Sequence, residues 1–142
     1  MAQKPIIFAL ANPNPEISPE LAKKVRPDAI IATGRPDFPN QVNDQIVFPF
    51  IYRAVLDVRS KKITTAMMIA AAKAIAEVAK LDVPDSVKEI YGNPHMAFGP
   101  EYILPTPFDS RLLPEISGAI AKSAVELGHG TKYYTSIDNY KA

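Results

Sequence analysis

Two short apolar runs separated by one helical segment constrain the fold of this chain most strongly. The first run, PIIFALANP, stops at an Asn-Pro pair, and the second, DAIIATG, stops at Gly34. The segment between them, SPELAKKV, offers Ser18 as a helix N-cap and Pro19 at the first helical position. This order predicts a βαβ unit with two parallel strands, each buried on both faces.

The rest of the chain has mostly helical patterns. Apolar residues recur at helical spacing over 46–58, 64–80 and 109–128, and Thr64 or Thr65 would cap the second of these helices. PDSVKEIYG predicts a short helix closed by Gly92, and EYILPTPFD an extended segment. Gly128 ends the last helix, and we expect the tail from His129 to fray. The predicted inward-facing residues are Phe50, Ala54, Asp57 or Val58, Met68, Ala71, Ala72, Ile75, Val78, Ala79, Ile116, Ile120, Ala124 and Leu127.

Two or three strands followed by helices do not make a complete α/β domain, because a doubly wound sheet needs more strands to cover its helices. The fold class that follows is α/β, as a portion of a doubly wound parallel sheet with flanking helices. At 142 residues, the chain is one domain or a piece of one.

Composition excludes several classes of partner. The net charge is +1, from 16 basic and 15 acidic residues, so we expect neither nucleic acid nor an anionic membrane as a partner. There is no cysteine, which excludes disulfides and thiolate sites and suits a reducing cytoplasm. The N-terminus lacks the pattern of a signal peptide, and the longest apolar run, AMMIAAA, is far below a membrane span. We therefore expect a cytoplasmic chain.

No self-sufficient catalytic motif is present. The sequence contains no G-x-G-x-x-G turn, no P-loop and no H-E-x-x-H helix. We interpret His95 as a loop residue and His129 as part of a helix end. Asp37 and Asp44 stand singly, whereas oxygen-ligand metal sites need several converging carboxylates. We expect no complete metal site and no catalytic residue within this chain.

Asn12 and Asn43 are the candidate binding residues. Asn12 ends the first predicted strand, and Asn43 lies beyond the carboxyl end of the second. Ligands of open α/β sheets bind outside the carboxyl ends of the strands, and a carboxamide offers both a donor and an acceptor. The alternative is that Asn12 belongs only to a turn, because Asn-Pro is a common turn former.

Four segments in this order resemble the malic enzyme family, in its shorter bacterial-type members: FALANPNPEISPE, DAIIATGRPDFPNQVN, FPFIYRAVLDVRS and FGPEYILPTPFDSRL. The resemblance runs over about residues 4 to 128. It implies a Rossmann-like NAD(P)-binding domain, in an enzyme that oxidatively decarboxylates malate to pyruvate and CO2 with NAD or NADP and a divalent metal, Mg or Mn.

The resemblance covers only the second half of that domain, so residues 1–142 would be its C-terminal part. In the family, the catalytic Tyr and Lys, the acidic metal ligands and the Gly-rich dinucleotide turn all precede this region. By resemblance, Asn12 and Asn43 line the cofactor and substrate pocket, where they hydrogen-bond the nicotinamide ribose or amide and the substrate carboxylate. The partners implied are malate or pyruvate and the missing N-terminal portion.

One position departs from the family. A second Asn usually follows the position of Asn43, whereas this chain has Asp44. A carboxylate there would repel the malate carboxylate unless it is protonated or paired. Asp44 therefore either points away from the substrate or alters the preference among acids.

The functional alternatives are a part of a malic enzyme that shows no malate oxidation on its own, a non-catalytic remnant that serves as a structural or interaction module, and, more weakly, another Rossmann dehydrogenase. An isolated half-domain would expose apolar surface meant for its other half. We therefore expect a homo-oligomer or strand exchange.

Overall fold

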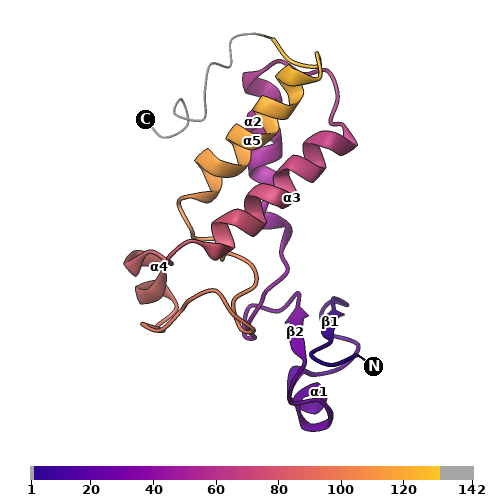
Figure 1. Ribbon diagram of the computed structural model, residues 1–142, viewed down its shortest axis with the longest axis vertical. Coiled ribbons are helices and arrows are strands. Elements are labelled where there is room, and N and C mark those ends of the chain that lie inside the picture. Colours follow the sequence, from indigo (N-terminus) through magenta and orange to yellow (C-terminus); the bar gives the residue numbers. More distant parts are fainter. Residues whose placement is uncertain (1, 132–142) are drawn as a thin grey trace.

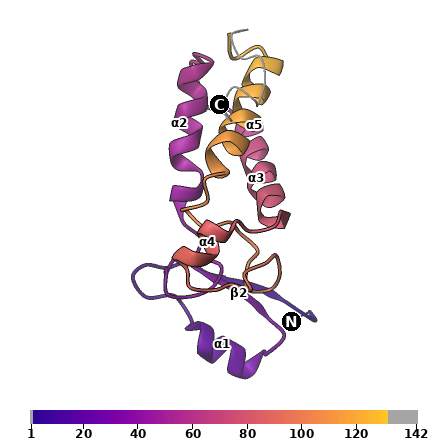
Figure 2. The same ribbon diagram turned by 90° about the vertical axis from the view of Figure 1, so that its left-hand side faces the viewer.

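A computed structural model describes residues 2–131 (Figure 1). Its elements are β1 (Ile6–Ala9), α1 (Pro19–Val25), β2 (Ile30–Thr33), the 3-10 helix η1 (Asp44–Ile46), α2 (Phe48–Asp57), α3 (Thr65–Lys80), α4 (Asp85–Ile90) and α5 (Leu112–Glu126). The two strands and α1 lie at one end of the molecule, and α2, α3 and α5 form a layer of helices at the other (Figures 1 and 2). The tail predicted to fray lies, from residue 132 on, outside the described residues.

The predicted βαβ unit is confirmed. β1 and β2 pair in parallel, from Ile6 opposite Ile30 to Ala9 opposite Thr33. Ser18 caps α1 by accepting a hydrogen bond from the Leu21 N–H at 3.2 Å, with a proline following at the start of the helix. The α/β class and the parallel pairing therefore follow from local sequence signals.

The prediction that both strands are buried on both faces is wrong for β1. Ala32 and Thr33 of β2 are fully buried, but Ile6 and Phe8 of β1 are 60% and 56% exposed. The cause is the size of the sheet, which has two strands among the described residues. α1 packs on β2, and no described element covers the side chains of Ile6 and Phe8.

The main hydrophobic core lies between α2, α3 and α5. Its buried residues are Ile46, Ala54, Val58, Met67, Ala71, Ile75, Val78, Leu112, Ile116, Ile120, Ala121 and Ala124. Phe50 packs against this core, and its carbonyl oxygen accepts a hydrogen bond from the buried Ser117 hydroxyl at 3.2 Å. Thr64 caps α3 through a bond from the Met67 N–H, as predicted.

Three predicted core positions are wrong. Met68 is 49% exposed and Ala72 is exposed, because the buried stripe of α3 runs through Met67 and Ala71, one residue earlier at each turn. Leu127 is 51% exposed, because α5 ends at Glu126 and the chain turns away there. The other predicted inward positions are buried or packed against the core. Of the alternatives Asp57 and Val58 at the end of α2, Val58 is the buried one.

Irregular chain links α4 to α5. Gly92 and Gly128 follow the ends of α4 and α5 with φ of 61° and 71°, a conformation that favours glycine, and so terminate these helices as predicted. The predicted extended segment EYILPTPFD forms a loop, whose only described pairing is one bridge between Gly99 and Tyr102. Across residues 2–131, no helix is long and apolar enough to cross a membrane.

Candidate functional site

The carboxyl ends of both strands meet at one edge, which faces the layer of helices (Figure 1). Thr33, the last residue of β2, pairs with Ala9 of β1 and also forms a parallel bridge with Gln41. The Val42 N–H donates to the Thr33 carbonyl oxygen at 2.7 Å. Because β1 occupies one side of β2, Gln41 and Val42 must lie on its other side. After β2 the chain leaves the strand and returns to it at Gln41. We call this segment, residues 34–41, the β2 loop.

Asn12 lies at this edge against Gly34, the first residue of the β2 loop. A Cβ atom built on Gly34 would be 2.9 Å from the Asn12 Oδ1 atom and 3.0 Å from its Nδ2 atom. Only a residue without a side chain allows this close approach. The Asn12 side chain is exposed, so its carboxamide is open to a ligand at the end of the strands.

Asn43 lies on the other side of β2, two residues after Gln41. Its Oδ1 atom accepts a hydrogen bond from the Gln45 N–H at 2.9 Å, which makes it the N-cap of η1. Its Nδ2 group has no hydrogen-bond partner within residues 2–131, so its donors are available. The structure thus places both predicted residues at the carboxyl end of β2, on opposite sides of it. Asp44 begins η1 and is exposed.

The tip of the β2 loop carries an ion pair. Arg35 holds Asp37 through two hydrogen bonds of 2.8 and 2.6 Å, and its guanidinium lies 5.3 Å from the centre of the Phe38 ring. The hydrogen bonds from Arg35 lower the pKa of the Asp37 carboxyl, while the carboxylate raises the pKa of Arg35. The two charges offset each other, so the loop presents little net charge to a ligand.

Asn40 is a buried polar residue that no sequence pattern indicated. It is 7% exposed, has a φ of 57°, and its Nδ2 group donates to the Ile31 carbonyl at 2.9 Å and the Pro100 carbonyl at 2.8 Å. Its Oδ1 atom accepts from the Ile103 N–H at 2.9 Å. No local signal could have revealed this role, because two of the three partners are 60 and 63 residues away.

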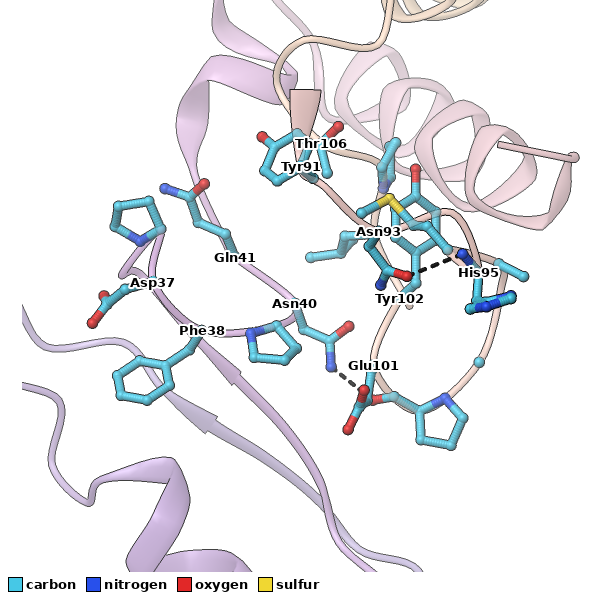
Figure 3. Close-up of a pocket in the computed structure, with 18 residues that line it drawn as sticks. Asp37, Phe38, Asn40, Gln41, Tyr91, Asn93, His95, Glu101, Tyr102 and Thr106 are labelled. Carbon is cyan, nitrogen blue, oxygen red and sulfur yellow. Dashed lines mark hydrogen bonds between the residues drawn. The ribbon is translucent and has the colours of Figure 1, made fainter. Parts of the chain in front are cut away.

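A cavity of about 590 Å³ separates the β2 loop from the loop between α4 and α5 (Figure 3). His95 lies on the side of the cavity formed by the α4–α5 loop, where its backbone N–H donates to Asn93 Oδ1 at 3.0 Å. Glu101 and Tyr102 line the same side. Burial raises the pKa of Tyr102, and the nearby Asp109 carboxylate adds to the effect. Neither Asn12 nor Asn43 lines this cavity.

The two other predictions about polar groups concern metals and His129. Within residues 2–131, no group of three or more His, Cys, Asp or Glu side chains could hold a metal ion. His129 follows α5, and its N–H donates to the Ala124 carbonyl at 2.8 Å, as expected of a residue at a helix end.

Comparison with known proteins identifies the family. The profile of the family described as "Malic enzyme, NAD binding domain" matches residues 1–93, which is more than half of the chain. The chain belongs to this malic enzyme family. The resemblance of the four sequence segments is therefore confirmed, and so is a Rossmann-like α/β fold.

Individual malic enzymes are similar over almost the whole chain. The NADP-dependent malic enzyme of Escherichia coli is 53% identical over 99% of this chain, which covers 18% of that protein. The NAD-dependent malic enzyme of Rhizobium meliloti is 48% identical, with the same two coverages of 99% and 18%. The crystal structure of malic enzyme from Pyrococcus horikoshii matches 99% of this chain and 28% of its own, with a TM-score of 0.79 and 38% identity. The chain thus spans about a fifth of the length of these curated relatives.

Proposed function

We propose that residues 1–142 are the C-terminal part of an NAD(P)-binding domain in an enzyme that converts malate to pyruvate and CO2 while reducing NAD or NADP. The observation that carries the proposal is the pair of carboxamides, Asn12 and Asn43, that flank the carboxyl end of β2 in a chain of the malic enzyme family. This edge is where α/β sheets bind nucleotides.

The available groups suit a nicotinamide nucleotide and a small acid. Asn12 presents both a donor and an acceptor, and Gly34 leaves space for its carboxamide. Asn43 uses its oxygen to cap η1 and keeps its amide donors for a ligand. Ribose hydroxyls and the nicotinamide amide both donate and accept, whereas a malate carboxylate only accepts. Asn12 therefore fits the nucleotide, and the Nδ2 donors of Asn43 also fit the substrate carboxylate.

The chain orients the reactants in this proposal and does not transfer protons. A nicotinamide nucleotide, when bound, would supply the acceptor for a hydride from C2 of malate. Asn12 and Asn43 hold the ring and the acid in the geometry that transfer requires, which is a contribution of proximity and orientation. The charged groups of the adjacent β2 loop, Arg35 and Asp37, offset each other through their ion pair at 2.6 Å.

The remaining parts of the reaction belong to chain outside residues 1–142. A divalent cation, Mg or Mn, would supply Lewis-acid polarisation of a substrate oxygen, with ligands from the missing N-terminal portion. The same portion would supply the proton-transfer residues and the rest of the nucleotide site. We therefore expect the chain alone to show no malate oxidation. Because relatives of similar identity use NADP in one case and NAD in another, we propose either nucleotide as the cofactor. The absence of cysteine suits the cytoplasm as its location.

The alternative function is a catalytically inactive module that acts by binding other protein surfaces. Exposed apolar side chains favour it: Phe8 on β1 is 56% exposed and Leu56 on α2 is 73% exposed. The same exposure is expected of a domain half that lacks its other half, so this alternative needs an experiment.

A chimera separates the two functions. The matching segment of the E. coli NADP-dependent malic enzyme is replaced by this chain, and malate-dependent NADPH formation is followed by absorbance. We expect activity from the chimera. In contrast, Asn12→Ala and Asn43→Ser should reduce it, and Asn43→Ser retains the N-cap of η1 while removing the amide donors.

The control is Asn14→Ala, which changes an exposed amide two residues after Asn12 and should leave activity unchanged. A chimera that assembles and melts like the parent enzyme but forms no NADPH from malate would favour the inactive module. Equal activity of the Asn12, Asn43 and Asn14 variants would contradict the assigned binding roles.

A further inference from the structure

Asn40 connects two separate parts of the molecule, β2 and the loop between α4 and α5, through the three hydrogen bonds of one side chain. Its carboxamide bonds to Ile31 within β2, and to Pro100 and Ile103 in the loop between α4 and α5. Asn40 and residues of the loop that it bonds, Pro100 among them, line the cavity (Figure 3). The side chain thus joins the strand edge to the part of the chain that leads into the helical layer.

A carboxamide is required by the chemistry of these three bonds. Two carbonyl oxygens need donors and one backbone N–H needs an acceptor, and a carboxamide supplies both from adjacent atoms. An aspartate carboxylate would place an oxygen against two carbonyl oxygens. Asparagine is also among the few residues that tolerate a φ of 57°. With 7% of its surface exposed, Asn40 cannot exchange these partners for bulk water.

The loop residues that bond to Asn40 lie beside a small buried cluster. Tyr102, between Pro100 and Ile103, is buried with Val83, which precedes α4, and with Val87 within α4. The part of the α4–α5 loop that bonds to Asn40 is therefore packed against α4 through Tyr102.

The chain directly after Asn40 carries the candidate ligand residue. Gln41 bridges to Thr33, the Val42 N–H bonds to the Thr33 carbonyl at 2.7 Å, and Asn43 follows. Three consecutive residues, 40–42, are thus bonded to β2, but Asn40 is the one among them that also bonds the α4–α5 loop, at 2.8 and 2.9 Å. Asn43 is also held on its C-terminal side by η1, through the bond from the Gln45 N–H at 2.9 Å. On its N-terminal side, loss of the Asn40 carboxamide would leave the bonds of 41–42 to Thr33 and remove the connection to the α4–α5 loop.

We infer that Asn40 is a positioning residue: by bonding β2 and the α4–α5 loop together, it sets where Asn43 stands at the carboxyl end of β2. It touches neither substrate nor cofactor in this role. The inference rests on the proposed function of Asn43, and it names Asn40 as the residue that orients Asn43.

The test compares Asn40→Gly and Asn40→Asp in the chimera described above. Asn40→Gly keeps the backbone conformation and removes all three bonds, and we expect about a tenfold rise in KM for malate with a smaller change in kcat. Asn40→Asp should show a similar rise at neutral pH. The ratio of its KM for malate to that of the unsubstituted chimera should shrink at acidic pH, because a protonated carboxyl group regains one donor. A purely structural role would lower the active fraction without a change in KM or this pH dependence.

Amide hydrogen exchange of the same proteins tests the positioning without any activity. In Asn40→Gly, exchange should increase both at Ile103, which loses its acceptor, and in the peptide that contains Val42 and Asn43. The control is Asn93→Asp, which alters an exposed amide on the opposite wall of the cavity and keeps the oxygen that accepts from His95. It should change neither KM nor exchange around Val42.

The outcomes separate the inference from the proposed function. An unsubstituted chimera without activity would contradict the proposed function, while increased exchange at Val42 and Asn43 in Asn40→Gly would still support the positioning. Unchanged exchange at Val42 and Asn43, or an active Asn40→Gly chimera with unchanged KM for malate, would overturn the inference.

Discussion

Gly34→Ala tests the geometry of the candidate site with the addition of a single methyl group. The new Cβ would be 2.9 Å from Asn12 Oδ1 and 3.3 Å from its Cγ atom, closer than ordinary van der Waals contact. The φ of Gly34 does not lie in the left-handed region, so alanine meets no backbone strain there. The obstacle is the end of a rotatable side chain, and we expect Asn12 to swing away from Gly34.

The expected effects on stability and affinity differ. Replacing a glycine with alanine reduces the conformational entropy of the unfolded chain, which stabilises the folded state by about 0.4–1 kcal/mol. This gain offsets the cost of moving the exposed Asn12 carboxamide. The free energy of unfolding should therefore change by less than about 1 kcal/mol. Loss of one neutral hydrogen bond to the ligand costs about 1 kcal/mol, or roughly a fivefold rise in KM for the nucleotide.

The assay is a double-mutant cycle in the chimera, with KM measured for NADP and stability by denaturant unfolding. In the background of Asn12→Ala, Gly34→Ala should have almost no further effect on KM, because the displaced carboxamide is already gone. The matched control is Gly130→Ala, whose Cβ would be 3.0 Å from Val58 Cβ in the packed helices. It should destabilise by about 1–3 kcal/mol without changing KM. Equal effects of Gly34→Ala with and without Asn12 would refute the contact as the cause.

Three further predictions concern the buried ion pair, Asp44 and the exposed strand. Arg111→Ala removes the guanidinium that bonds the fully buried Asp109 carboxylate at 2.7 Å. The free energy of unfolding, measured with denaturant, should fall by about 3 kcal/mol, and a loss below roughly 1 kcal/mol would contradict this. Asp44→Asn in the chimera should lower KM for malate, because it removes a carboxylate that would repel the substrate; an unchanged KM would mean that the side chain points away. The isolated chain should self-associate through β1, where Ile6 and Phe8 are exposed, and Phe8→Lys should reduce the association seen by light scattering. A sharply monomeric chain with cooperative melting would count against the last prediction.

The sequence by itself determined the elements whose signals are local. Ser18 caps α1, Thr64 caps α3 and Gly92 ends the short helix α4, each through bonds or backbone angles within a few residues. The order of strand, helix and strand in turn required a parallel pair, and hence a shared carboxyl edge. Because both asparagines follow a strand of this pair, the sequence alone predicted that Asn12 and Asn43 lie at the same edge.

The tertiary structure decided what depends on distant neighbours. Alanine-rich α3 has apolar residues around much of its surface, so only packing against α5 selected Met67 over Met68 for the core. The exposure of Phe8 follows from the number of strands beside it, which its own sequence does not encode. The partners of Asn40 lie as far as 63 residues along the chain, and only the folded loops bring them within hydrogen-bonding distance. Capping and turn formation act over a few residues, whereas burial and long-range hydrogen bonds exist only once separate segments have packed.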